Sequence, residues 1–220
     1  MLKGGIIVSC QAESGSYFDN SNSILSFAKE AERGGAVGLR IKDPDDVKVV
    51  RKNTSLPIIG LTKSYYSGTN LVLITPTYED IVNLKNAGAD YIAVDATGRN
   101  GYEHILKVKA ALDINIIGDL SDIRETEQAI ESGCCILTTA LSGYTENKLL
   151  YNSWEPDFNL LSSLVNNFQL PVLAEGRYWI LDHVKRAIDI GAQAVVIGSA
   201  ITRPHLITKY FNSAFLKERK

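Results

Sequence analysis

The chain has 220 residues, 45% hydrophobic and 22% charged, and such a composition can bury an ordinary core in one large domain or two small ones. Its formal net charge of −2, with no basic run, predicts no general attraction to nucleic acid or to anionic lipid. No segment approaches the roughly 20 apolar residues that cross a bilayer, and the apolar run near the N-terminus is too short for a signal peptide. We therefore expect a cytoplasmic protein that has neither a nucleic-acid nor a membrane partner.

Eight segments have the composition of strands that are buried on both faces. Apolar and small residues run continuously through them, which is typical of parallel strands covered by helices. In chain order they lie within residues 5–10, 32–41, 57–62, 86–97, 115–120, 131–140, 171–176 and 189–200. The second, fourth, sixth and eighth follow a glycine that suits the C-terminal cap of a helix. The chain thus repeats a unit of helix, glycine and strand.

Apolar residues at helical spacing fill the gaps between these segments. Residues 24–31 carry apolar side chains at positions i, i+1, i+4 and i+7, and residues 180–188 repeat and extend that pattern. Ser121 is a natural N-cap for a helix that begins at Asp122. The last segment, about 204–218, is expected to form an extra helix after the eighth unit.

Eight alternating strand–helix units in about 200 residues predict a closed (β/α)8 barrel, the TIM barrel, as a single domain over residues 1–220. An open doubly wound sheet is the alternative. Such sheets usually have about five to seven strands, and this chain lacks the GxGxxG fingerprint after its first strand. A long loop is expected at residues 142–158. In a closed barrel, the active site lies at the C-terminal ends of the strands.

Two charged residues at these strand ends are the candidate acid–base pair. Lys63 directly follows the third strand, where burial and the cationic neighbour Arg40 would lower its pKa from about 10.4 toward about 7–8. Glu175 ends the seventh strand, roughly across the mouth of the barrel from Lys63. The two residues could exchange protons with one substrate, or they could form an ion pair that only stabilises the rim.

The sequence GSAITRP at residues 198–204 is the candidate phosphate site. Gly198 and Ser199 end the eighth strand, and a short helix after them would offer free N–H groups to an anion. Arg203 adds a planar fork for phosphate oxygens, and Gly176 lies in the loop after the seventh strand. The loops after strands seven and eight are the recurrent phosphate site of this fold.

A phosphate site beside a lysine and a glutamate predicts proton abstraction next to the carbonyl of a sugar phosphate. Lys63 could be an acid–base group that yields an isomer, or it could form a Schiff base in an aldolase. A metal-dependent epimerase would need histidine and carboxylate ligands at strand ends. None of His104, His183 and His205 lies at a predicted strand end, so we expect no metal and no other cofactor. A phosphosugar-binding sensor without catalysis is a further alternative.

Nine short stretches, spread along nearly the whole chain, are together more specific for one family than a generic barrel pattern is. They are GGIIVSCQA, GGAVGLRI, LPIIGLTK, ITPT, DATGR, DLS, TTALSGYT, PVLAEGRYW and VVIGSAITRP. With them the chain resembles the bacterial N-acetylmannosamine-6-phosphate 2-epimerase family of sialic acid catabolism. The resemblance implies a (β/α)8 barrel that converts N-acetylmannosamine 6-phosphate to N-acetylglucosamine 6-phosphate.

The same resemblance assigns roles to individual residues. Lys63 moves the C2 proton, and Glu175 is the acidic partner that helps to open the ring or handles the O1 and O5 protons. The residues assigned to the sugar pocket are Gln11, Arg40 and Asp119, together with Thr139 at its strand end. The residues assigned to the phosphate site are Gly176, Gly198, Ser199 and Arg203, together with the neighbouring Arg177.

The barrel family also suggests a homodimer. The C-terminal segment carries an apolar stripe formed by Leu206, Ile207, Tyr210, Phe211 and Phe215. Such a stripe can pack on its own barrel or on the barrel of a partner. Exchange of the terminal helix between two subunits is therefore a hypothesis.

Overall fold

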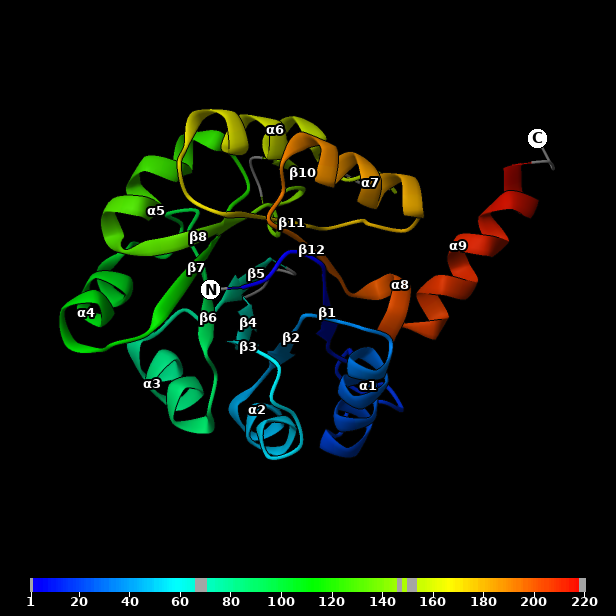
Figure 1. Ribbon diagram of the computed structural model, residues 1–220, viewed down its shortest axis with the longest axis horizontal. Coiled ribbons are helices and arrows are strands. Elements are labelled where there is room, and N and C mark those ends of the chain that lie inside the picture. The colour runs from blue at the N-terminus through cyan, green and yellow to red at the C-terminus, as the bar shows by residue number, and fades with distance from the viewer. Residues whose placement is uncertain (1, 66–70, 146–147, 150–153, 218–220) are drawn as a thin grey trace.

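A closed barrel of eight parallel strands forms the centre of the protein (Figure 1). The computed structural model describes residues 2–65, 71–145, 148–149 and 154–217. The strands follow one another around the barrel in the order β1, β12, β11, β8, β7, β6, β3, β2. Their bounds are β1 Ile6–Cys10, β2 Gly38–Lys42, β3 Ile58–Leu61, β6 Tyr91–Asp95, β7 Asn115–Asp119, β8 Cys134–Thr138, β11 Val172–Glu175 and β12 Ala194–Ile197. The predicted (β/α)8 barrel is confirmed, and the pairing of β1 with β12 excludes the open sheet.

Helices surround the barrel on its outside (Figure 1). Their bounds are α1 Ser21–Arg33, α2 Pro44–Arg51, α3 Tyr78–Ala87, α4 Glu103–Ala111, α5 Thr126–Ser132, α6 Phe158–Asn167, α7 Leu181–Ile190, α8 Ser199–Thr202 and α9 Pro204–Lys217. Glycines end α3 and α7 as the sequence predicts. Gly88 and Gly191 have φ values of 101° and 109°, a left-handed conformation that strains any residue with a side chain.

The helix expected to begin at Asp122 starts differently. Asp122 caps a short 3-10 turn, η1 Ile123–Glu125, by accepting from the N–H of Arg124, and α5 follows that turn. Ser121 instead donates its hydroxyl to Glu125 Oε1 at 2.6 Å. The predicted cap is therefore wrong by one residue, because serine and aspartate stand side by side and both residue types cap helices.

Two antiparallel hairpins extend beyond the barrel strands, and the sequence patterns do not predict either. β4 Lys63–Tyr65 pairs with β5 Val72–Ile74, and β9 Tyr144–Thr145 pairs with β10 Lys148–Leu149. Within the loop expected at residues 142–158, residues 146–147 and 150–153 lie outside the described residues. Lys63 thus lies on a short strand and not in a loop.

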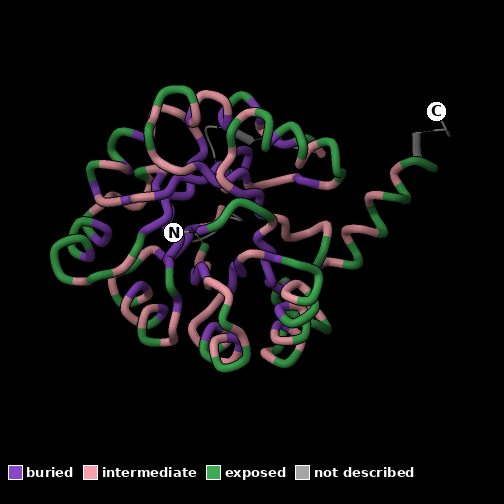
Figure 2. The backbone as a smooth tube through the Cα atoms, viewed as in Figure 1, coloured by how far each residue is buried: buried purple, intermediate pink, exposed green. Residues whose placement is uncertain are grey.

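The core has two layers that the barrel wall separates. Side chains from alternate strand positions fill the interior of the barrel, among them Ile7, Ile59, Ile117 and Leu173. A second, larger cluster joins the outer faces of the strands to the helices. Figure 2 shows the strands as the buried centre, with exposed backbone on the outer turns of the helices. Among the described residues, none of the helices is long and apolar enough to cross a membrane.

The chain departs from the regular barrel after its last strand. The helix that directly follows β12 is α8, which has four residues, and α9 then points away from the barrel (Figure 1). Phe211 and Phe215 on α9 are 66% and 70% exposed. The outer face next to α7 is correspondingly uncovered, since Leu181 and Ile188 of that helix are 67% and 59% exposed.

Gly60 of β3 tests the packing between the barrel wall and α3. A Cβ at this position would lie 2.9 Å from Ala89 Cβ and 3.1 Å from Leu84 Cδ2, closer than packed carbons tolerate. We expect Gly60→Ala to lower the free energy of unfolding by about 1–3 kcal/mol, as overpacking does. Urea denaturation followed by circular dichroism measures this difference. The exposed Ser26→Ala is the control, and a Gly60→Ala midpoint equal to that of the wild type would contradict the packing argument.

Candidate active site

A cavity of about 450 Å³, here called the mouth cavity, opens at the C-terminal ends of the barrel strands. The sequence-predicted residues that line it are Gln11, Arg40, Lys63, Asp119, Glu175, Gly176, Arg177, Gly198, Ser199 and Arg203. These residues lie on β2, β4, β7 and β11 or in the segments directly after β1, β11 and β12, so only the closed barrel brings them together. Among the described residues, no group of three or more histidine, cysteine, aspartate or glutamate side chains could hold a metal ion.

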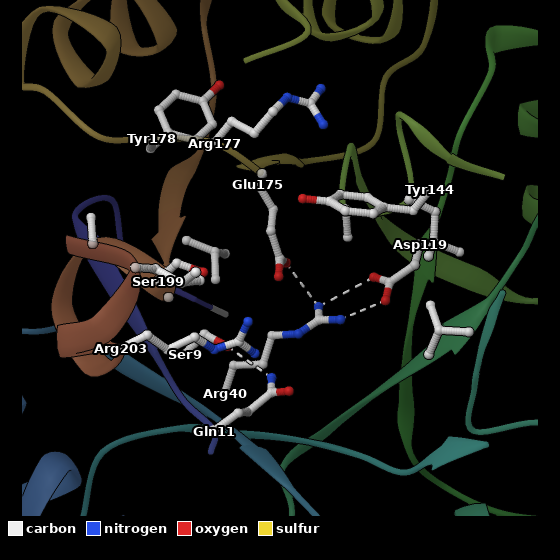
Figure 3. A pocket seen from close by; sticks show the side chains of 18 of the residues that line it. Ser9, Gln11, Arg40, Asp119, Tyr144, Glu175, Arg177, Tyr178, Ser199 and Arg203 are labelled. Atoms are coloured by element: carbon white, nitrogen blue, oxygen red, sulfur yellow. Dashed lines mark hydrogen bonds and ion pairs between the residues drawn. The ribbon is translucent and has the colours of Figure 1, made fainter. Parts of the chain in front are cut away.

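A buried guanidinium holds two carboxylates at the floor of the mouth cavity (Figure 3). Arg40 donates from NH1 and NH2 to the two carboxylate oxygens of Asp119, at 3.2 and 2.5 Å. The same NH1 lies 2.9 Å from Oε2 of Glu175. Thr138 donates its hydroxyl to Asp119 Oδ1 at 2.9 Å. Asp119 is thus fully satisfied, whereas Glu175 shares a cation that another carboxylate already engages.

Burial is the main influence on the protonation of Glu175. Burial raises the pKa of Glu175 to about 7, and the neighbouring Asp119 acts in the same direction, while Arg40 opposes both. A carboxyl group with such a pKa can hold or release a proton near neutral pH. The backbone of Glu175 is fixed as well, because its N–H donates to Thr139 Oγ1 at 3.0 Å and its carbonyl accepts from that hydroxyl at 2.8 Å.

Lys63 has the opposite shift in the same cavity. Burial, together with the neighbouring cations Arg203 and Arg40, lowers the pKa of Lys63 to about 8. At pH 7 roughly a tenth of such a lysine is neutral, compared with less than a thousandth at the ordinary pKa. Among the described residues, the ion pair of Glu175 is with Arg40 and not with Lys63. The alternative in which the lysine and the glutamate merely form a rim ion pair therefore loses its basis.

Thr139 is placed differently from the prediction. Its hydroxyl both donates to and accepts from the backbone of Glu175, and Thr139 is not among the described residues that line the mouth cavity. Its side chain lies behind the cavity wall, with the residue 2% exposed. Thr139 thus supports Glu175 from behind, and a direct contact with a ligand has no support in this arrangement.

Arg177 lines the mouth cavity, but its guanidinium donates hydrogen bonds to the neighbouring loop. Its Nε donates to the carbonyl of Glu155 at 2.6 Å, and its NH1 donates to the carbonyl of Ser142 at 2.7 Å. The residue has a φ of 64°, which is uncommon without glycine and aims the side chain at that loop. Arg177 therefore joins the segment after β8 to the end of β11. Its predicted role in holding a phosphate stays a prediction.

Gly198, Ser199 and Arg203 gather at one end of the mouth cavity. A Cβ on Gly198 would lie 3.2 Å from Ser9 Cβ, so glycine allows the end of β12 to approach β1 closely. Thr202 donates its hydroxyl to the carbonyl of Ser9 at 3.1 Å and fixes α8 there. Arg203 NH1 pairs with Glu13 Oε1 at 3.2 Å, which holds the guanidinium at the rim. The first N–H groups of a helix have no partner within it and attract anions.

Gln11 presents an unpaired acceptor near the same cavity. Its Nε2 donates to Ser9 Oγ at 2.8 Å, while its Oε1 is buried without a hydrogen-bond partner. A buried acceptor without a partner is costly, and cavities that bind polar ligands are where such groups are found. The Gln11 amide oxygen is therefore available to accept a hydrogen bond from a ligand.

Two tryptophans in the cavity wall are not predicted from the sequence. Trp154 and Trp179 line the mouth cavity and meet edge to face with their ring centroids 5.1 Å apart. Tyr210 of α9 stacks on Trp179 at 5.2 Å. Trp179 directly follows the predicted strand-end motif and could have been found there. Trp154 lies in a stretch without periodicity, so no sequence pattern points to it.

Comparison with known proteins gives one consistent result. A family model described as "Putative N-acetylmannosamine-6-phosphate epimerase" matches residues 24–217. A relative from Caldanaerobacter subterraneus subsp. tengcongensis, named "Putative N-acetylmannosamine-6-phosphate 2-epimerase", is 38% identical over 100% of this chain and 94% of its own length. A relative of the same name from Clostridioides difficile is 35% identical over 97% of this chain and 96% of its own length.

Solved structures agree with the sequence comparison. The N-acetylmannosamine-6-phosphate 2-epimerase from Clostridium perfringens superposes with a TM-score of 0.88 and 35% identity, over 97% of this chain and 94% of that one. A thiamine phosphate pyrophosphorylase from Pyrococcus furiosus has a TM-score of 0.60 and 14% identity, over 91% of this chain and 87% of that one, and shares the fold alone.

The opposed shifts of Lys63 and Glu175 can be measured without any substrate. We expect NMR titration to give a pKa of about 8 for Lys63 and about 7 for Glu175. In Glu175→Gln the pKa of Lys63 should fall further, because the carboxylate that stabilises its ammonium form is gone. The surface variant Glu79→Gln is the control. A Lys63 that titrates at its ordinary value near 10.5 would show that the cavity does not desolvate it.

Proposed function

The chain belongs to the N-acetylmannosamine-6-phosphate epimerase family, and from this premise we propose that it converts N-acetylmannosamine 6-phosphate to N-acetylglucosamine 6-phosphate. One observation supports the assignment of this reaction to particular residues. A lysine with a lowered pKa and a glutamate with a raised pKa line one cavity with Gly198, Ser199 and Arg203, the candidate phosphate residues. That combination suits the movement of a proton at carbon 2 of a sugar phosphate.

Lys63 is the proposed base that moves the C2 proton. The C2 hydrogen is acidic only when C1 is an open-chain aldehyde, and its removal leaves an enolate that needs a cation or hydrogen-bond donor beside it. The neutral amine of Lys63 accepts the proton, and the resulting ammonium group then lies next to the enolate. Return of a proton to the opposite face of C2 inverts that centre.

Glu175 is the proposed acid–base partner of Lys63. With a pKa of about 7 it can donate a proton to the ring oxygen or accept one from the C1 hydroxyl as the sugar ring opens. Arg40, which Asp119 holds in turn, holds its carboxyl group at the cavity floor. One proton shared between Lys63 and Glu175 supports a bell-shaped pH profile, whose limbs belong to the pair.

The two ends of the mouth cavity set the direction in which the substrate lies. Gly176, Gly198, Ser199 and Arg203 supply the phosphate end, because backbone N–H groups and a guanidinium suit a dianion. Gln11 accepts a hydrogen bond from the sugar through its unpaired Oε1. With the 6-phosphate held at the phosphate end, the sugar carbons lie in the rest of the cavity, which Lys63 and Glu175 line.

The setting of the reaction follows from the family resemblance. We place it in the catabolism of sialic acid and related amino sugars, in the cytoplasm, without a metal or other cofactor. Residues 1–220 are assigned to one barrel domain with α9 as its terminal helix.

A homodimer in which two copies exchange α9 would cover the apolar outer face of the barrel that α8 leaves exposed. An apolar groove lies along the outer face there, with Ile6, Leu181, Val184, Ile188 and Ile201 in its lining. In a regular barrel a full-length eighth helix covers this face, because strands buried on both sides need it. α8 is four residues long and cannot do so.

α9 has the properties of the missing cover. It is 14 residues long and points away from its own barrel (Figure 1), and its residues Phe211 and Phe215 are exposed. Its first turns stay anchored, since Tyr210 stacks on Trp179. Exchange of identical elements is a low-cost route to a symmetric dimer. We therefore propose that α9 of each copy lies in the groove of the other.

Proton NMR in heavy water tests the reaction. With N-acetylmannosamine 6-phosphate, the wild type should yield the glucosamine epimer with deuterium at C2. Lys63→Met should lower the rate by roughly 10²- to 10⁴-fold, because a general base contributes about that much. The exposed Lys48→Met is the matched control and should keep full activity. The proposal would be contradicted by a wild type that forms no epimer. It would also be contradicted if borohydride, added with the substrate, trapped a covalent Schiff base on Lys63, because an aldolase forms such an adduct.

Light scattering tests the exchange of α9. The double variant Phe211→Asp, Phe215→Asp and the groove variant Leu181→Asp should each shift the protein from dimer to monomer, since both place charge in the proposed contact. All three positions are exposed in the single chain, so the fold itself should survive. Leu106→Asp, at an equally apolar exposed position on α4, is the control. If a chain that ends at Pro204, and so lacks the rest of α9, still forms the dimer, the exchange is ruled out.

A further inference from the structure

Lys63 is carried by an element that the barrel sheet does not hold. β4 and β5 form a separate two-stranded sheet, in which Lys63 pairs with Ile74 and Tyr65 pairs with Val72. An isolated pair of strands is at best marginally stable in water. The position of the lysine amine therefore depends on whatever fastens this hairpin to the barrel.

The base of the hairpin and its inner face account for part of that fastening. The N–H of Thr62 donates to Thr75 Oγ1 and the N–H of Thr75 donates to the carbonyl of Thr62, both at 3.0 Å. Ile74 is 3% exposed and packs in the cluster inside the barrel. Toward the other end of β5, where Val72 is only half buried, packing contributes less.

Arg99 supplies a polar fastening at that less packed end. Its NH2 donates to the carbonyl of Val72 at 3.1 Å. The same nitrogen donates to Asp95 Oδ2 at 2.5 Å, and its Nε donates to Thr97 Oγ1 at 2.8 Å. Asp95 ends barrel strand β6, and Thr97 donates to its Oδ1 from both its N–H and its hydroxyl. The guanidinium thus connects a rigid barrel strand to β5.

The next residue repeats the connection. Asn100 donates from Nδ2 to the carbonyl of Pro76 at 2.7 Å, just beyond the C-terminal end of β5. The segment after β6 therefore bonds to β5 and to the residues directly after it through two side chains. Of these two, Arg99 is the residue whose charge is paired with a buried carboxylate, that of Asp95. None of these atoms belongs to the residues that line the mouth cavity, apart from those of Val72.

We propose that Arg99 is a positioning residue that sets the place of the Lys63 amine by fastening β5 to the end of β6. The proposal rests on the function proposed above, in which Lys63 is the base. A planar guanidinium can bond a carboxylate and a carbonyl in two fixed directions, which a lysine ammonium on a flexible stem cannot reproduce. When this bond is lost, we expect the Val72 end of β5 to loosen and the paired strand β4, which carries Lys63, to shift so that the amine gains water.

Arg99→Lys tests this role with the charge preserved. The variant keeps a cation for Asp95 but loses the simultaneous bond to the Val72 carbonyl. We expect kcat to fall roughly tenfold, because small displacements of a catalytic group are costly, while KM changes little since the phosphate end is untouched. The basic limb of the pH profile should move upward as Lys63 becomes more solvated.

The pKa of Lys63 is a readout that does not depend on turnover. NMR titration should give a higher value in Arg99→Lys than the value near 8 expected in the wild type. Arg124→Lys is the matched control, because Arg124 forms a comparable bond to Asp122 at 2.8 Å in the loop after β7 and is exposed. Asn100→Ala should act in the same direction as Arg99→Lys, to a smaller extent.

The outcomes separate this proposal from the proposed function. If the wild type epimerises and Arg99→Lys leaves kcat, the pH limb and the Lys63 pKa unchanged, the positioning role is overturned while the function stands. Loss of stability with an unchanged Lys63 pKa would also overturn it, since Arg99 would then be merely structural. If the wild type does not epimerise, the function fails, and a raised Lys63 pKa in the variant would still support the fastening.

Discussion

The sharing of one buried guanidinium by two carboxylates is the interaction on which this site depends. Arg40 satisfies Asp119 with two hydrogen bonds and has one remaining ionic contact for Glu175. Burial alone would make both carboxylates costly, and a single cation compensates them unequally. The result is an aspartate held by two hydrogen bonds from one guanidinium and a glutamate whose pKa is raised to about 7.

The closed barrel makes this arrangement possible because it brings strand ends to one level. Asp119 on β7 lies opposite Asp95 on β6 and Thr138 on β8 in the parallel register, and Arg40 reaches it from β2 across the interior. The same closure moves the end of β12 against β1, where Gly198 permits the close approach. The buried Arg40, Asp119 and Glu175 and the segment after β12 thus line one cavity.

Lys63 and Glu175 are held by different parts of this frame. Glu175 belongs to a barrel strand and is fixed by Thr139, whereas Lys63 belongs to a hairpin outside the barrel sheet. The segment after β6 is bonded to the β5 side of this hairpin through Arg99, which donates to the Val72 carbonyl, and Asn100, which donates to the Pro76 carbonyl.

The sequence by itself determined the eight buried strands, the barrel and the list of strand-end residues, because periodicity and glycine caps report local burial. It also pointed to Lys63 and Glu175. Only the tertiary structure decided that the Thr139 hydroxyl bonds to the backbone of Glu175, that Arg177 bonds to a loop, and that Lys63 lies in a hairpin. Those facts depend on register and on side-chain direction between segments far apart in the chain, and no local pattern carries that information.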